Sequence, residues 1–153
     1  MRLRLLSVGR DRSGLFEPAV QEYASRLKRY VKFELVEVPE SKRAAEPVGR
    51  DEESEALLAK LKPGERLWLL DEHGKEPDSR ELAALLGRVL QEGRDLAVAV
   101  GGASGHGAPA RERAERTLSL SRLTLAHRLA RLVAAEQLYR AFTILRNEPY
   151  HRD

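Results

Sequence analysis

The sequence contains no cysteine among its 153 residues, which excludes disulfide bonds, thiolate metal ligands and thiol nucleophiles. No apolar run approaches the roughly 20 residues that are needed to span a bilayer. The apolar stretch near the N-terminus, within MRLRLLSVGRD, is too short for a signal peptide. With 42% hydrophobic and 33% charged residues, the composition is typical of a soluble globular protein. We therefore expect a single domain, residues 1–153, located in the cytoplasm and without a membrane partner.

Motifs for several common chemistries are missing as well. The histidines, at positions 73, 106, 127 and 151, lack the spacings that ligands use, so no metal site is predicted. The glycine-rich stretch GGASGHG is neither a Walker A loop nor a dinucleotide fingerprint. Ser104 does not complete a G-x-S-x-G motif, because His106 occupies the last position. These absences argue against a nucleotide-binding P-loop protein and an α/β hydrolase. The glycines indicate either backbone close to a ligand or an ordinary turn.

Basic residues are unevenly distributed along the chain. Residues 1–110 carry 18 basic and 19 acidic side chains, whereas residues 111–153 carry nine arginines against five acidic residues. Arginine outnumbers lysine by 21 to 6, and its planar guanidinium group suits phosphate. The C-terminal third is therefore a candidate nucleic-acid interface. A general preference for arginine in the composition would explain the same numbers without any partner.

Hydrophobic periodicity predicts strands that alternate with helices. The predicted strands are 2–8, 32–38, 66–70, 95–100 and 119–125. The predicted helices are 15–30, 50–61, a helix capped by Asp78 and Glu81 that runs to Leu90, a helix opened by Pro109, and 127–146. Loops are expected at 39–49 and 71–75.

This alternation predicts an α/β fold with a mostly parallel sheet flanked by helices. In such sheets, ligands bind beyond the carboxyl ends of the strands. Three segments meet that condition: the residues after Leu70, those after Val100, and 120–125. The pattern alone therefore marks these three segments as candidate ligand-binding loops.

The predicted helix 127–146 is apolar on more than one face. Its large apolar residues are Leu129, Leu132, Val133, Leu138, Tyr139, Phe142, Ile144 and Leu145. A helix that is apolar on most sides is buried on most sides, and a domain of this size has little material to surround it. We therefore expect a symmetric homodimer around this helix. The alternative is a helix that lies wholly inside one protomer.

The sequence ends in EPYHRD, in a position where chains normally fray. Tyr150 can stack on a base, His151 can exchange a proton near neutral pH, and Arg152 can bind a phosphate group. Ordering each residue costs roughly 1–2 kcal/mol of backbone entropy. We therefore expect this tail to be loose until a partner docks, and nucleic acid is the natural partner.

Four segments in order carry a resemblance to a known family: LLDEHGK (69–75), VGGASG (100–105), LSLSRLTLAH (118–127) and AAEQLYRAFTILRNEPYHRD (134–153). Together with LRLLSVGR and FELVEVPESK nearer the N-terminus, they resemble the ribosomal RNA large subunit methyltransferase H family. Its members are small enzymes of the SPOUT class. The resemblance covers essentially the whole chain.

The resemblance implies a SPOUT-type α/β fold with a C-terminal trefoil knot, and a homodimer packed through the last helix. It implies S-adenosyl-L-methionine as methyl donor, no metal, and N3-methylation of a pseudouridine in 23S (large-subunit) ribosomal RNA. An assembled ribosome is the expected substrate, although the sequence does not decide between a free subunit and a whole ribosome. A non-catalytic RNA-binding protein that uses the arginine-rich end is the alternative function.

By position in the family, the methyl donor would lie in the knot. The residues that would line its pocket are Leu70, Gly101, Gly102, Leu120, Ser121, Arg122, Leu123, Thr124 and Leu125. Two departures from the family pattern occur: Ala126 stands where many relatives have proline, and GASGHG replaces a G-x-x-G stretch followed by an apolar residue. Neither departure removes a glycine of the pocket.

The implied reaction is a direct displacement at a sulfonium, so no covalent residue is required. The substrate nitrogen is an imide N–H, and it becomes a good nucleophile only after it loses its proton. His127, His151 and Arg152 are the candidates for accepting this proton or stabilising the anion, with Tyr150 positioning the base. The sequence does not decide among them. We expect the tail of one protomer to reach the methyl donor of its partner.

Overall fold

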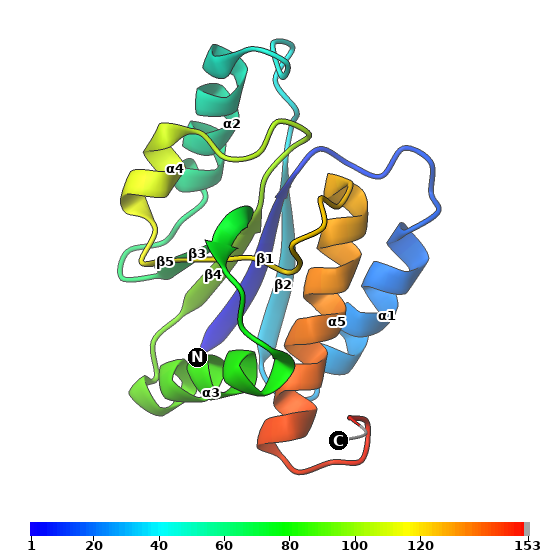
Figure 1. Ribbon diagram of the computed structural model, residues 1–153. Helices are drawn as coiled ribbons and strands as arrows, with labels where there is room; N and C mark the ends of the chain where they lie inside the picture. The colour runs from blue at the N-terminus through cyan, green and yellow to red at the C-terminus, as the bar shows by residue number, and fades with distance from the viewer. Residues whose placement is uncertain (152–153) are drawn as a thin grey trace.

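The computed structural model describes residues 1–151. Its strands, all parallel, are β1 (Arg2–Val8), β2 (Lys32–Val38), β3 (Arg66–Lys75), β4 (Leu96–Val100) and β5 (Arg116–Leu118). Its helices are α1 (Glu17–Leu27), α2 (Pro47–Ala59), α3 (Ser79–Glu92), α4 (Ala108–Arg113) and α5 (His127–Leu145). The sheet has the strand order β2-β1-β4-β3-β5 (Figure 1). The predicted α/β fold with a parallel sheet is therefore confirmed.

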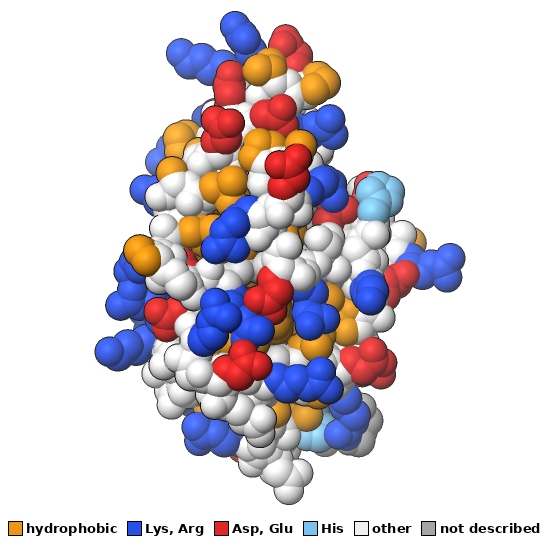
Figure 2. Space-filling model, turned by 90° about the vertical axis from the view of Figure 1, so that its left-hand side faces the viewer, with side chains coloured by type: hydrophobic (Ala, Val, Ile, Leu, Met, Phe, Trp, Pro, Cys, Tyr) orange, Lys and Arg blue, Asp and Glu red, His pale blue; other side chains and the backbone are white. Residues whose placement is uncertain are grey.

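The helices cover both faces of the sheet (Figure 1). Helices α1, α3 and α5 lie on one face, with α5 packed against both of the others, and α2 packs with α4 on the opposite face. On the side of the molecule that carries α2 and α4, Lys and Arg side chains are interspersed with Asp and Glu (Figure 2). This side therefore lacks the single-sign charge that a nucleic-acid interface would present.

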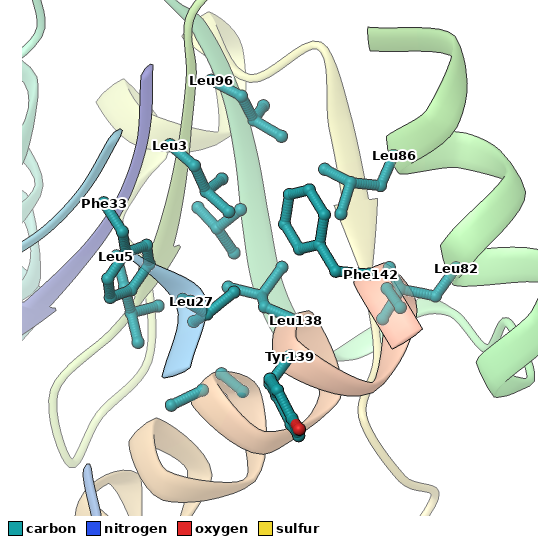
Figure 3. Packing of buried hydrophobic residues seen from close by; sticks show 14 of the residues in the cluster. Leu3, Leu5, Leu27, Phe33, Leu82, Leu86, Leu96, Leu138, Tyr139 and Phe142 are labelled. Carbon is teal, nitrogen blue, oxygen red and sulfur yellow. The ribbon is translucent and has the colours of Figure 1, made fainter. Parts of the chain in front are cut away.

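The larger hydrophobic core lies between the sheet and the three helices α1, α3 and α5 (Figure 3). Leu138 and Phe142 of α5 point toward Leu86 of α3 and toward Leu3 of the sheet, and all four side chains are at most 3% exposed. A second cluster fills the space under α2 and α4. Because both faces of the sheet are buried, β4 is a continuous apolar run. Strand β1 is buried as well, but it includes Arg4, whose buried guanidinium is ion-paired with Glu65.

Two predicted boundaries at the carboxyl ends of strands are wrong. Residues 71–75 were expected to form a loop, but β3 continues to Lys75, which pairs with Leu118 after a bulge. Residues 119–125 were expected to form a strand, but β5 ends at Leu118. The hydroxyl of Ser119 donates to the Ser121 carbonyl (2.7 Å), and such local side-chain hydrogen bonds compete with a sheet ladder.

The helix boundaries differ less from the prediction. Helix α1 is shorter than 15–30: the carboxylate of Asp11 accepts hydrogen bonds from the Phe16 and Glu17 amides and fixes its start, and after Leu27 the chain continues as a turn. Helix α2 begins at Pro47, inside the predicted loop 39–49, since proline suits the first turn of a helix. The predicted cap of α3 is present: Asp78 accepts from the Glu81 amide at 2.8 Å.

The chain is tightly packed where β5 passes β3. A Cβ atom on Gly74 would lie 2.7–2.8 Å from backbone atoms of Thr117 and Leu118, so only glycine fits there. The trefoil knot implied by the family resemblance stays a prediction, and this close passage is compatible with it. Among the described helices, none is both long and apolar enough to cross a membrane.

Candidate active site

A pocket of about 320 Å³ opens at the carboxyl edge of the sheet. Its walls come from the segments that follow Leu70 in β3, from the loop after β4, and from the segment between β5 and α5. Eight of the nine residues predicted to hold a methyl donor line it: Leu70, Gly101, Gly102, Leu120, Ser121, Leu123, Thr124 and Leu125. The three loops marked from the strand pattern therefore converge on one cavity. Which ligand the cavity binds stays a prediction.

Arg122 is the ninth predicted residue, and it does not line the pocket. Its side chain is 87% exposed, and its Nε atom lies 3.8 Å from Oε1 of Glu76. The reason is local: Leu123 donates its amide to the Ser121 hydroxyl (2.9 Å), and this turn leaves Arg122 outside.

In the glycine-rich loop after β4, backbone atoms without side chains form part of the pocket wall. A Cβ on Gly101 would lie 2.8 Å from the carbonyl carbon of Gly105, and a Cβ on Gly102 would lie 2.9 Å from Oε1 of Glu53. Gly105 has a positive φ of 80°, which favours glycine. The Ser104 hydroxyl donates to the Ala44 carbonyl at 2.7 Å, so this side chain ties the loop to the β2–α2 connection.

His127, the first residue of α5, lines the same pocket. Its Nε2 atom lies 3.7 Å from the position that a Cβ on Gly9 would occupy, so the ring packs against the end of β1. Burial, followed by the positive charge of Arg128, holds the pKa of His127 below its ordinary 6.5, although Glu40 acts in the opposite direction. The imidazole is therefore neutral at pH 7 and is able to accept a proton.

Sequence reasoning missed an ion pair at the pocket, between the largely buried side chain of Asp71 and the exposed Arg111. Asp71 directly follows the apolar run of β3; its side chain is 5% exposed and accepts from the Arg111 guanidinium at 2.6 Å. Burial alone would raise the pKa of Asp71, but the His73 amide and Arg111 outweigh burial and lower it. Asp71 could have been predicted from the sequence, because it is a carboxylate that directly follows the apolar run of β3. Arg111, 40 residues further along the chain, could not have been identified as its partner.

Tyr150, the first predicted catalytic residue of the tail, lies at the other end of α5. The ring of Tyr150 packs edge-on against that of Tyr139 at 4.7 Å, and its hydroxyl lies 3.3 Å from the Tyr23 hydroxyl and 3.2 Å from Oε2 of Glu136. Tyr139 is 12 residues beyond His127, which corresponds to about 18 Å along a helix. The structure therefore does not bring Tyr150 to His127 within one protomer. His151 follows Tyr150 directly, and Arg152 lies outside the described residues.

The tail as far as Tyr150 makes more contacts with the rest of the chain than the sequence led us to expect. Glu148 accepts a hydrogen bond from the Tyr30 hydroxyl at 2.6 Å, and the Arg140 guanidinium lies 4.8 Å from the centre of the Tyr150 ring. Burial and the contacts with Tyr23 and Glu136 raise the pKa of Tyr150. The sequence presents Tyr150 as a single apolar anchor, and it does not reveal the aromatic cluster that Tyr150 joins. The looseness of the tail without a partner stays a prediction.

The other two histidines have separate surroundings. His106 is buried, and its Nε2 atom lies 3.1 Å from the Ala99 carbonyl oxygen, whereas His73 is exposed. Within residues 1–151, no group of three or more His, Asp or Glu side chains is arranged to hold a metal ion. The polar groups of the pocket wall include backbone, hydroxyl and imidazole groups, the ion pair of Asp71 with Arg111, and the side chain of Arg50.

Comparison with known proteins gives a consistent result. A family model described as "Predicted SPOUT methyltransferase" matches residues 1–151. The chain is similar to the ribosomal RNA large subunit methyltransferase H of Anaeromyxobacter sp. (strain Fw109-5), with 61% identity covering 99% of this chain and 100% of that protein. The protein of the same name from Pelobacter propionicus is 46% identical, covering 99% of both chains. A crystal structure of a probable methyltransferase from Bordetella pertussis Tohama I superposes with a TM-score of 0.58 at 25% identity, covering 92% of this chain and 93% of the other.

Proposed function

This chain belongs to the SPOUT methyltransferase family, and on that basis we propose that it methylates N3 of a pseudouridine in large-subunit ribosomal RNA. The proposed methyl donor is S-adenosyl-L-methionine, and the proposed place of action is the cytoplasm, where ribosomes are found. The observation that carries the proposal is the convergence of three separate chain segments on one pocket beside His127. The names of the similar proteins supply the substrate class.

The residues of the pocket fit such a donor. Its volume lies at the lower end of the range typical for small-molecule sites, roughly 300–1,000 Å³. Leucine side chains from β3 and from the segment 120–125 offer apolar surface for a purine ring. The cradle at Gly101 and Gly102 has no space for Cβ atoms, so backbone atoms can approach the ligand directly. When bound, the donor supplies an electrophilic methyl group on a positively charged sulfur.

We propose that His127 accepts the proton from N3 of the target base. Its place at the pocket and its neutral state at pH 7 support this role. His127 is also the one predicted catalytic residue that lies at the pocket of its own protomer, among the described residues. Holding the base and the imidazole in a fixed arrangement would contribute several kcal/mol through orientation alone.

The second part of the proposal is a homodimer through the outer side of α5. On this helix, Leu129, Leu132 and Val133 are only half-buried, and α1 and α3 flank α5 without covering its outer side (Figure 1). A two-fold axis perpendicular to α5 pairs the two copies antiparallel. The carboxyl end of one α5 then lies beside the amino end of the other. Tyr150, His151 and Arg152 of one protomer would thereby approach the pocket of its partner.

A methylation assay tests the proposal. The protein is incubated with the labelled donor and with intact ribosomes that lack the modification, and the position of the methyl group is then mapped. Free 23S RNA and separated subunits serve as parallel substrates. We expect incorporation at a pseudouridine N3 on assembled particles. Donor binding without incorporation on any of these substrates would contradict the proposed substrate. Salt-dependent RNA binding without donor affinity would instead favour a non-catalytic RNA-binding protein.

A further inference from the structure

Glu53 of α2 is a buried carboxylate with one unpaired oxygen. The residue is 3% exposed. Its Oε2 atom accepts a hydrogen bond from the Ser41 amide at 2.9 Å, whereas Oε1 has no hydrogen-bond partner among the described residues. Buried charged groups are normally paired, because an unpaired charge in the interior is strongly destabilising. The position of Glu53 therefore requires an explanation.

The unpaired oxygen lies directly behind the pocket wall. A Cβ on Gly102 would come within 2.9 Å of Glu53 Oε1 and within 3.1 Å of Val8 Cγ1. Gly102 also lines the pocket. Only the backbone of one glycine therefore separates this oxygen from the space that the ligand would fill.

No cation on the protein compensates this carboxylate, as far as the described residues show. Burial raises the pKa of Glu53, the Ser41 amide opposes that rise, and the charged neighbours that act on it, Glu40 and Glu52, are acidic as well. Such an arrangement lowers stability in the free protein. It becomes favourable when a positive charge arrives on the other side of Gly102, where low exposure to water limits screening.

We propose that Glu53 is the counter-charge for the sulfonium of the methyl donor and acts across the backbone of Gly102. The inference rests on the proposed function, because it takes the pocket as the donor site. Glu53 touches no reacting atom in this account, so it is a positioning residue. The methyl donor carries the positive sulfur and the thioether product does not, so Glu53 would favour binding of the donor over retention of the product.

Two other roles for Glu53 lead to different observations. A purely structural role, in which Glu53 anchors the Ser41 amide beside the glycine loop, would affect the donor and the product equally. Pairing with the ammonium group of the donor would also affect both equally, because the product keeps that ammonium. The sulfonium is the charge that differs between the two ligands. A comparison of their affinities therefore separates the proposal from both alternatives.

The experiment uses isothermal titration calorimetry on the full chain and on the variant Glu53→Gln, which keeps size and an acceptor for Ser41. Glu55→Gln is the matched control, since Glu55 is an exposed residue on the same helix and the substitution is identical. Three probes are titrated at pH 8: S-adenosyl-L-methionine, sinefungin with an amine in place of the sulfonium, and the neutral thioether S-adenosyl-L-homocysteine. The melting temperature of each ligand-free variant is recorded as well.

We expect Glu53→Gln to weaken binding of both cationic probes about tenfold and that of the thioether less than threefold. Its ligand-free melting temperature should equal or exceed that of the wild type, because a buried unpaired charge has been removed. Glu55→Gln should behave as the wild type. An equal loss for all three probes, no loss at all, or a lower melting temperature would each overturn the assignment. A wild type that binds none of the probes would instead contradict the proposed function itself.

Discussion

At the amino end of α5, His127 faces an open pocket whose wall includes glycines with no space for a side chain, and the unpaired carboxylate oxygen of Glu53 lies behind one of them, Gly102. At the carboxyl end of the same helix, Tyr139 and Phe142 are packed among other aromatic rings, and their neighbours are hydrogen-bonded. The amino end, which we call the open end, leaves a polar group without a hydrogen-bond partner among the described residues, and this lowers stability. The carboxyl end, which we call the packed end, provides partners for its polar groups. The comparison suggests that one end is arranged for ligands and the other for a firmly held structural element.

The two ends are nevertheless linked by the proposed reaction. The family resemblance assigns chemistry to Tyr150 and His151, which lie at the packed end, and to His127, which lies at the open end. Within one protomer the contacts of Tyr150 with Glu136 and Tyr139 place it roughly 13–18 Å along the helix from His127. In the proposed antiparallel pair of α5 helices, the tail of one copy would instead approach the His127 of the other.

The largest expected effect is at the open end. Replacing His127 with Ala should lower the rate of methylation by a factor of about 10²–10⁴, because a general base typically contributes that much. Donor affinity should change by less than about threefold. Single-turnover methylation of ribosomes and calorimetry of the donor measure the two quantities. A variant with near-normal turnover would show that His127 is not the base.

The pH dependence of turnover gives the next largest effect. Since burial and Arg128 hold the pKa of His127 below 6.5, the imidazole is neutral and active above that pH and becomes protonated and inactive below its pKa. The single-turnover rate should therefore be constant near pH 7–8. At acid pH it should decrease, and the decrease should approach tenfold for each pH unit. This acid limb should be missing from the residual rate of His127→Ala. An identical limb in that variant would assign the titration to another group.

Substitution of Gly101 tests whether donor binding depends on the close approach of the backbone to the donor. Gly101→Ala places a Cβ 2.8 Å from the Gly105 carbonyl carbon, so the loop must shift, and donor affinity should fall at least tenfold. Gly87→Ala is the control, because its Cβ would meet only the flexible end of the Leu145 side chain at 3.0 Å. Calorimetry with the donor compares the two variants. Equal affinities would mean that the loop adapts without loss.

The packed end should respond in stability. Tyr150→Phe removes a hydroxyl that contacts Tyr23 and Glu136 and should lower the free energy of unfolding by about 0.5–1 kcal/mol. Tyr150→Ala also removes the ring contact with Tyr139 and should lower it by about 2–3 kcal/mol. Urea unfolding measures both changes. If Tyr150→Ala unfolds like the wild type, the tail is not held by this cluster.

The sequence predicts the open end of α5 better than the packed end, and the reasons are physical. Strand periodicity and glycine positions predicted the loops that form the pocket, since carboxyl ends of parallel strands share one edge. Long-range pairs such as Asp71 with Arg111 leave no periodic trace, and neither does the contact of Glu53 with Gly102. The contacts of the tail were also missed, because Tyr23, Tyr139 and Tyr150 come from distant parts of the sequence and meet through the packing of α1 against α5.

The most direct test of the shared site is complementation between two inactive variants. One is His127→Ala with an intact tail, and the other keeps His127 but is truncated before Tyr150. If sites are built from two copies, mixed dimers contain one site with both an intact His127 and an intact partner tail. Co-assembled equal amounts should then recover about a quarter of the wild-type methylation rate. If the mixture is as inactive as either variant alone, while mixed dimers are present by mass, the site is built within one chain and the account is contradicted.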